Sequence, residues 1–285
     1  MSDRARWGAY VACAVLASVV ALLPLFVPFD DACTLHSVRP GGQLMEEPSR
    51  LFFLGTDSIG RSEALRLFFA IRTSLALSSA ATAIALGLGL VLGLASSTPS
   101  ARARRTWIPV SADALLLFFV EVSLAVPFVL LVVSLAAVLD EVTPVAIVLV
   151  MAASAAPTAA KLVRDRAVRV QRERFVDAAY ALGAREFSVL LRHVAEPCVR
   201  LSLTLAPAFF AQLLLAEAAL GYLGLGLPPP AATLGNLLAD GQDFLADAPR
   251  LLLLPCATVV ILVAASGSVS NALVTRQQEA SHGDR

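Results

Sequence analysis

The sequence has one lysine and only three histidines, and these shortages exclude several kinds of site. Lys161 follows Ala160, so no Gly-x-x-x-x-Gly-Lys-Ser/Thr loop exists and the chain cannot bind ATP in the P-loop manner. His36, His193 and His282 are far apart, and none lies in a long apolar run. The sequence therefore lacks the residues that a histidine-based zinc site or a proton relay through the membrane would need.

Other absences exclude further classes of protein. There is no Gly-x-Ser-x-Gly elbow, and a rhomboid-like protease would need a serine–histidine pair within the apolar runs. The four cysteines are scattered, so we expect no disulfide framework. The formal net charge is zero, so the chain as a whole has no excess positive charge that would attract nucleic acid. We expect no enzyme activity, no metal site and no cofactor bound by this chain.

Six long apolar runs define the class of protein. The chain is 58% hydrophobic and 15% charged, with a mean hydropathy of +0.76, unlike an ordinary soluble domain. A helix needs roughly 20 residues to cross about 30 Å of hydrocarbon, and it satisfies every backbone amide within its own segment. The sequence therefore predicts an all-α integral membrane protein with six transmembrane helices. They are expected at Trp7–Phe29, Thr73–Ala101, Val122–Leu139, Val142–Ala160, Leu201–Ala216 and Leu251–Thr275.

The first run can be a cleaved signal peptide or an uncleaved helix. Its 23 residues exceed an ordinary h-region and no small-x-small cleavage site follows, which favours an uncleaved helix for residues 1–29. Residues 30–66 are too polar to cross and are expected to be extracytoplasmic. Residues 67–275 are expected to form a five-helix core, and residues 276–285 a cytoplasmic tail.

The placement of basic residues indicates the orientation. If residues 161–200 are cytoplasmic, alternation of six helices places both termini and the loop around Arg104 inside as well. Sixteen basic residues then lie inside and six outside. This ratio agrees with the excess of lysine and arginine in cytoplasmic loops.

The longest strongly charged segment runs from Gln171 to Pro197. Apolar residues recur there at helical spacing in two groups, separated by Gly183. The groups are Phe175, Ala178, Ala179 and Leu182, followed by Phe187, Leu190, Leu191 and Val194. This pattern predicts two short amphipathic helices. Such a pair either lies in the membrane interface or docks a soluble partner, and periodicity alone leaves both open.

The motif Asp177-Ala178-Ala179, three residues and then Gly183, resembles the cytoplasmic signature of ABC-importer permeases, Glu-Ala-Ala-x-x-x-Gly. The flanking Ala-Leu-Gly-Ala and Leu-Leu-Arg-His resemble the dipeptide, oligopeptide and nickel branch, although Pro197 comes one residue late. The resemblance implies a coupling-helix pair at about 171–195 that docks in a groove of a separate ATPase subunit. The implied docking residues are Arg174, Asp177, Ala178, Ala179, Leu182, Gly183, Ala184, Arg192 and His193.

Before and within the second span lie two further glycine motifs. The stretch Gly55–Arg61 by itself predicts a capped turn that opens a helix, because Thr56 or Asp57 can accept the first free amides. It also resembles the Gly-Thr-Asp-x-x-Gly-Arg stretch of peptide-importer permeases. The periplasmic-motif residues that this implies are Gly55, Thr56, Asp57, Gly60 and Arg61. Within the span, Gly89-x-x-x-Gly93 would let another helix approach closely.

The fifth span leads into three glycines and three prolines, which cannot continue a membrane helix. We expect the helix to end there, an extended outer segment to follow, and a short outer helix over Asp240–Pro249. The segment Ala216–Leu238 resembles the Glu-Ala-x-Leu-x-Phe-Leu-Gly-Leu-Gly-x-x-Pro-Pro segment of peptide and nickel permeases, with Tyr222 for phenylalanine and Leu234 for tryptophan. The resemblance implies that it lines the entrance and faces the binding protein.

Two carboxylates lie within predicted spans, where charge is costly unless it faces protein, water or a partner. Glu217 lets the fifth span extend to Leu220 if it faces the interior. Glu121 can reach the inner interface, and the stretch Glu121–Pro127 resembles the family's Asp-x-x-x-Ala-x-Pro, with a helix kink expected at Pro127. The pore and gate candidates are Glu121, Pro127, Glu217, Gly221, Tyr222, Gly224, Gly226 and Pro228.

Residues and resemblance together predict the permease subunit of an ATP-driven importer with the ABC importer type I fold, in a prokaryotic plasma (inner) membrane. The implied partners are a second homologous permease subunit, two ATP-binding subunits that carry the ATP, and an extracytoplasmic substrate-binding protein. The expected cargo is a peptide or a related small solute, such as a nickel complex, an oligosaccharide or an opine. The alternative is an ATP-independent secondary transporter or channel, which would need buried charges or broken helices near the midplane.

Overall fold

The computed structural model describes residues 45–50, 52–97, 142–229 and 231–283, together with positions 118, 120 and 122. The predicted spans Trp7–Phe29 and Val122–Leu139 therefore lie outside the described residues, apart from Val122 itself. The same holds for the site candidates Glu121 and Pro127.

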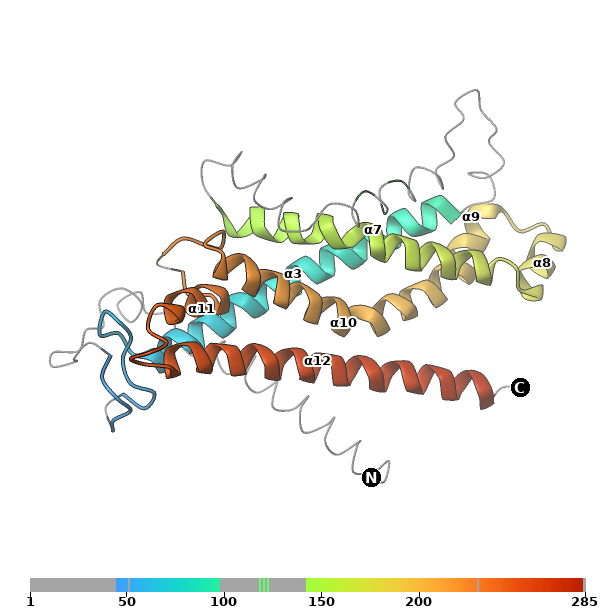
Figure 1. Ribbon diagram of the computed structural model, residues 1–285. Helices are drawn as coiled ribbons and strands as arrows, with labels where there is room; N and C mark the ends of the chain where they lie inside the picture. The colour runs from blue at the N-terminus through green and yellow to red at the C-terminus, as the bar shows by residue number, and fades with distance from the viewer. Residues whose placement is uncertain are drawn as a thin grey trace. The chain divides into compact units, whose positions relative to one another are not determined.

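The described chain consists of helices and short connections. In order they are α3 (Glu63–Ser97), α7 (Pro144–Val170), α8 (Arg174–Ala181), α9 (Glu186–Val189), a π-helical turn η1 (Leu190–Val194), α10 (Ala195–Tyr222), α11 (Leu234–Gln242) and α12 (Arg250–Gly283) (Figure 1). Four helical runs are long and apolar enough to cross a membrane: Glu63–Ser97, Pro144–Val170, Glu186–Tyr222 and Arg250–Thr275. Four of the six predicted spans are thus observed as helices.

These helices extend beyond the apolar runs that predicted them. α3 begins at Glu63 rather than at Thr73, and α7 continues past Lys161 to Val170. Hydropathy marks only the part of a helix that crosses hydrocarbon, whereas the backbone hydrogen bonds can continue into the polar layers. Pro157 lies inside α7 and Pro207 inside α10, yet neither ends its helix.

The predicted outer helix over Asp240–Pro249 is wrong in position. The helix in this region is α11, from Leu234 to Gln242. It begins there because the hydroxyl of Thr233 accepts the Asn236 N–H at 3.2 Å and so caps the first turn.

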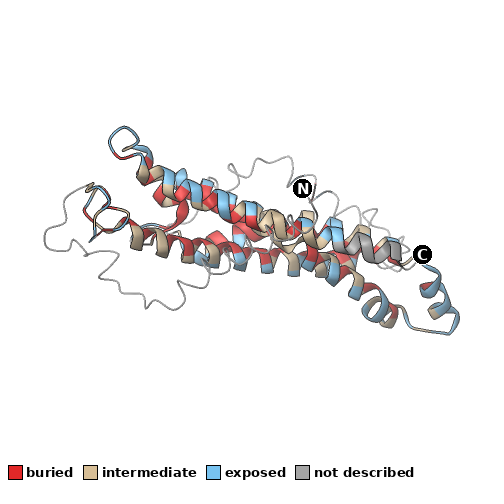
Figure 2. Ribbon diagram, turned by 90° about the horizontal axis from the view of Figure 1, so that it is seen from below, coloured by how far each residue is buried: buried red, intermediate tan, exposed pale blue. Residues whose placement is uncertain are grey.

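The chain divides into two compact units. The first comprises Met1–Ser79, Val132–Val148 and Phe210–Arg285, and the second comprises Ala80–Leu131 and Leu149–Phe209. Within each unit, every long helix has a buried side and an exposed side, as the colours in Figure 2 show.

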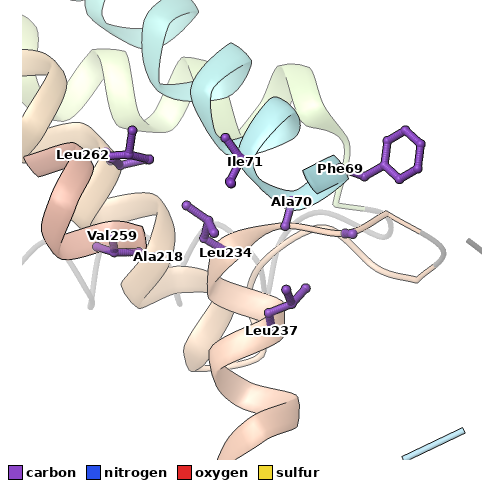
Figure 3. Packing of buried hydrophobic residues seen from close by; sticks show 10 residues of the cluster. Phe69, Ala70, Ile71, Ala218, Leu234, Leu237, Val259 and Leu262 are labelled. Atoms are coloured by element: carbon purple, nitrogen blue, oxygen red, sulfur yellow. The ribbon is translucent and has the colours of Figure 1, made fainter. Parts of the chain in front are cut away.

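The core of the first unit gathers around α11. Figure 3 shows Leu234 and Leu237 of this helix among apolar side chains from the first part of α3, the last part of α10 and α12. Leu234, which stands where the resembled family has a tryptophan, is fully buried. Its position at the centre of the cluster gives α11 a structural role in this unit.

In the second unit, α3 and α7 approach each other closely through Gly89 and Gly93. A Cβ placed on Gly89 would lie 2.5 Å from the Ala159 Cβ, and one on Gly93 would lie 2.6 Å from the Ala160 carbonyl oxygen. The predicted close approach at this glycine pair is confirmed. The later turns of α7 pack with Val194 and Cys198 in a second apolar cluster.

Candidate functional site

α8 ends in a turn that only glycine makes without strain. Gly183 has a φ of +83°. Its N–H donates to the Tyr180 carbonyl at 2.9 Å, and the Ala184 N–H donates to the Ala179 carbonyl at 3.1 Å. These two bonds form a Schellman motif, which stops the helix and redirects the chain. The predicted short helix that ends at Gly183 is confirmed, whereas the second predicted short helix is the beginning of a longer helical run, Glu186–Tyr222.

The helix pair exposes five large apolar or aromatic side chains, which we call the apolar knob. They are Phe175, Tyr180, Leu182, Phe187 and Leu191. Leu182 is 89% exposed and Phe187 is 70% exposed. An exposed apolar patch of this kind marks a contact with protein or membrane.

The apolar knob stands on a buried base. Val176 of α8 and Val189 of α9 are fully or almost fully buried. Val194 packs against Val163 and Ala167 of α7. Helical spacing in the sequence does not separate these two sets, because the residues that anchor the pair and the residues that it exposes are equally apolar.

The charged docking candidates lie at the surface of the pair. Arg174, Asp177, Arg192 and His193 are all exposed. The His193 ring lies 6.1 Å from the Phe175 ring, centroid to centroid, which places η1 beside α8. Burial, and then the nearby Glu186 carboxylate, raise the pKa of Tyr180 above its ordinary value.

The second helix of the pair continues without a break into α10. The Ala195 N–H donates to the Leu190 carbonyl, five residues earlier, which closes a π turn. A π turn accommodates an extra residue without ending the helix. Pro197 follows directly and does not stop it, so Glu186–Tyr222 is one helical run.

Just before the start of α3, the motif Gly55–Arg61 forms a turn of its own. The Asp57 Oδ1 accepts the backbone N–H groups of Ile59 at 3.0 Å and Arg61 at 2.7 Å. The expectation that Thr56 or Asp57 caps a helix is wrong, because Asp57 binds its own turn and the Thr56 hydroxyl accepts the Glu46 N–H. α3 starts only at Glu63.

Asp57 also begins a chain of ion pairs. Its Oδ2 accepts hydrogen bonds from Arg61 Nε at 2.7 Å and from Arg66 Nη1 at 3.0 Å. The other terminal nitrogen of Arg66, Nη2, donates to Asp240 Oδ2 at 2.7 Å. The side chains of Asp57 and Arg66 are nearly buried, where charge is tolerated only when it is paired. Arg66 therefore joins the Gly55–Arg61 motif to α11.

Arg250, the first residue of α12, binds the backbone of the stretch that precedes the Gly55–Arg61 motif. Its Nη2 donates to the carbonyls of Met45 at 2.9 Å and Glu46 at 2.7 Å. Gly55 has a φ of +81°, and a Cβ there would collide with the Glu46 carbonyl. The glycine that opens the motif is thus required both by its backbone conformation and by this contact.

Glu217 is buried near the end of α10. Ser74 of α3 and Thr233, the cap of α11, are the hydroxyl side chains beside its carboxylate. Each hydroxyl in turn accepts a backbone N–H, that of Leu234 at 2.9 Å for Ser74 and that of Asn236 at 3.2 Å for Thr233. The second carboxylate oxygen, Oε2, has no partner among the described residues.

The glycine-proline segment after α10 is held closely against α11. A Cβ on Gly221 would lie 2.7 Å from the Gly235 Cα, and one on Gly226 would lie 2.8 Å from the Asn236 Oδ1. The Asn236 amide donates to the Leu227 carbonyl at 2.7 Å and to the Ala231 carbonyl at 3.3 Å. Small residues and one amide therefore order a segment that has no regular structure.

These elements enclose an open cleft of about 1070 Å³ in the first unit. Its lining brings together Gly221, Gly224, Gly226 and Pro228 of the predicted gate with Arg61 of the predicted periplasmic motif. Asp240 and Asp243 lie on the α11 side. Of the gate candidates, Tyr222 is not in this lining and is 44% exposed, and Glu217 is buried one turn before Gly221.

Sequence reasoning missed three residues that connect these parts. Thr233 carried a signal, since threonine directly before a helix is a preferred cap. For Ser74 and Arg66 the sequence did not indicate the partners on α11, because Leu234 and Asp240 lie far along the chain. Among the described side chains, no group of three or more histidine, cysteine, aspartate or glutamate residues could hold a metal ion.

Comparison with known proteins agrees with these features. Residues 89–279 match the family described as "Binding-protein-dependent transport system inner membrane component". The chain is similar to the di/tripeptide transport system permease protein DppC of Pseudomonas aeruginosa, with 29% identity over 265 residues, 92% of this chain and 82% of that protein. It is also similar to the oligopeptide transport system permease protein OppC of Bacillus subtilis, with 27% identity over 245 residues, 84% of this chain and 73% of that protein.

A solved structure shows the same fold. A chain of the inward-facing MetNI methionine ABC transporter matches with a TM-score of 0.53 and 18% identity, over 74% of this chain and 97% of that one. The family match covers most of the present chain, including α7 to α11 and most of α12. The chain therefore belongs to the inner membrane components of binding-protein-dependent transport systems, the permeases of ABC importers.

Proposed function

We propose that this chain forms half of the translocation pore of an ATP-driven importer, with a second homologous permease subunit as the other half. Two ATP-binding subunits and an extracytoplasmic substrate-binding protein complete the assembly. Family membership supports a partner that hydrolyses ATP, and this chain has no P-loop of its own.

The apolar knob is the observation that carries the coupling role. It offers Phe175, Leu182 and Phe187 to a partner, on a base that is itself buried. Apolar and aromatic anchors in the middle of a patch, with charged residues at its edge, are typical of protein interfaces. Arg174, Asp177 and Arg192 supply that charged edge.

The continuous run from α9 through η1 to α10 suggests how docking drives transport. A shift of the knob would move the N-terminal end of the helical run Glu186–Tyr222. The C-terminal part of this run carries Glu217 and the cleft residue Gly221. Docking alone performs no work: the ATPase must favour a different position of the helix pair in its two states.

The cargo that we propose is a peptide or a related small solute. The relatives named above transport dipeptides, tripeptides or oligopeptides by their names, and the chain covers more than two thirds of each. The cleft beside α11 would then belong to the extracytoplasmic entrance, with Gly224, Gly226 and Pro228 facing the binding protein. The knob and both termini would be cytoplasmic.

A co-purification experiment tests the docking. The detergent-solubilised chain is expected to retain the ATPase encoded beside it. Leu182→Arg is expected to abolish this because it places a charge in the knob, and Gly183→Arg because arginine strains the turn that ends α8 at a φ of +83°. Leu245→Arg is the matched control, since Leu245 is 53% exposed but lies after α11, away from α8 and α9 in the sequence. Intact wild-type protein that never retains the ATPase, while a related permease does so, would contradict the proposal.

A further inference from the structure

The last turns of α7 carry basic side chains on one exposed face. Lys161, Arg166 and Arg169 lie on the helix and Arg172 lies in the turn that follows, and all four are exposed. At 3.6 residues per turn, the three on the helix fall within an arc of about 140°. We call these four residues the basic face.

The basic face points away from the packed core of its unit. The opposite side of α7 carries Val163, Ala167 and Val170, which are buried in an apolar cluster. Asp165 is the sole acidic residue of α7, and it pairs with Arg164 at 3.3 Å. Within the described ranges, none of the four basic side chains makes an ion pair.

The position of the basic face along α7 matches a lipid headgroup layer. α7 begins at Pro144 and rises about 1.5 Å per residue, so Arg166 lies about 33 Å and Arg169 about 38 Å from its start, while Lys161, at about 26 Å, reaches the headgroups through its long side chain. The hydrocarbon core of a bilayer is about 30 Å thick, with headgroup layers beyond it. Leu162, which is 38% exposed, lies on the same side at the boundary of the hydrocarbon.

We propose that the basic face binds the headgroups of anionic phospholipids in the leaflet that borders the apolar knob. Guanidinium groups bind phosphate with two parallel hydrogen bonds, and each lysine or arginine near a negatively charged leaflet adds to the attraction. Neighbouring arginines three residues apart repel one another, so a bound phosphate also relieves a cost within the helix. The inference goes beyond transport and requires only that α7 spans the membrane.

A protein partner fits this face less well. The centre of a protein interface is depleted in charge and rich in aromatic residues, and the basic face offers Leu162 as its single large exposed hydrophobic residue. The side chains that suit a protein lie on the separate apolar knob. The two surfaces can therefore be tested independently.

The test uses the purified full-length chain in detergent and counts bound lipids by native mass spectrometry. Phosphatidylglycerol is expected to bind more tightly than phosphatidylcholine, and the double variant Arg166→Gln/Arg169→Gln is expected to lose about fivefold in phosphatidylglycerol affinity for each arginine removed. Arg200→Gln is the matched control, because Arg200 is an exposed arginine that is already paired with Glu196 at 2.7 Å.

A second variant protects the test against misfolding. Arg166→Lys/Arg169→Lys keeps the charge, so it is expected to retain most of the phosphatidylglycerol binding. Equal binding by wild type and the glutamine variant would overturn the proposal, and so would an equal loss with Arg200→Gln or full displacement by inorganic phosphate. Retained lipid binding with loss of the ATPase in the glutamine variant would assign the face to a protein instead.

Discussion

At the scale of single residues, Glu217 shows how a membrane helix tolerates a carboxylate. The Ser74 and Thr233 hydroxyls beside it each accept a backbone N–H of α11. Each hydroxyl proton remains available to the carboxylate, so the acid can link α3, α10 and the cap of α11. In an apolar setting, polar groups satisfied in this way are far less costly than free ones.

We expect Glu217→Ala to be less stable than Glu217→Gln by about 1–3 kcal/mol, because alanine leaves the Ser74 and Thr233 hydroxyls without an acceptor. Glutamine keeps one acceptor oxygen in the same place and removes the charge. Thermal unfolding of the two variants in the same detergent, followed by size-exclusion chromatography, measures the difference. Equal melting temperatures would mean that this network does not stabilise the fold.

At the scale of helices, the pairing of α3 with α7 depends on small residues. In a membrane the surrounding lipid is as apolar as the helices, so close van der Waals contact, rather than burial from water, favours their association. Gly89 and Gly93 allow this contact with Ala159, Ala160 and Val163. The sequence motif predicted a close approach but did not identify α7 as the partner.

Gly89→Ala is expected to destabilise the protein by about 1–3 kcal/mol, because its Cβ would lie 2.5 Å from the Ala159 Cβ and the helices would have to separate. Gly87→Ala is the matched control two residues away, where a Cβ meets nothing within 4 Å. There alanine is expected to be neutral or stabilising, since it favours the helix. Thermal unfolding of both variants measures the difference in stability. A similar loss of stability in both would contradict the packing argument.

The helix pair was anticipated in outline at this scale. Gly183 and the apolar spacing predicted two short helices; the first is present as α8, and the second is the first part of the longer run Glu186–Tyr222. Which apolar residues face outward could not be predicted, because Val176 and Phe175 are adjacent and equally suited to a core. The π turn was not predicted either, because no pattern in the sequence marks it; Leu190 and Val194 on this turn pack in the same apolar cluster as Val163 and Ala167 of α7.

At the scale of the whole molecule, the proposed orientation can be tested by cysteine labelling. Arg50→Cys, before α3, and Ala181→Cys, at the end of α8, place thiols at exposed positions that the proposed topology assigns to opposite sides of the membrane. With a membrane-impermeant maleimide, Arg50→Cys is expected to react in intact cells, whereas Ala181→Cys is expected to react only after the cells are opened. The chain without an added cysteine gives the background from its four native thiols.

The reverse labelling pattern would place the apolar knob outside the cell, where no ATPase could reach it, and would overturn the coupling role. It would leave the lipid proposal standing, because the basic face requires only a headgroup layer at that end of α7. The two proposals therefore fail on different results.

The sequence by itself determined that the chain crosses a membrane, where four of its spanning helices lie, and that a short helix ends at Gly183, because these follow from apolar length and local backbone chemistry. Tertiary structure alone decided which residues meet: Arg66 with Asp57 and Asp240, Glu217 with Ser74 and Thr233, and the outward face of the apolar knob. The physical reason is that a lipid-facing residue and a core-facing residue are both apolar, so hydropathy cannot tell them apart. Polar partners brought together from distant parts of the chain leave no periodic signal in the sequence.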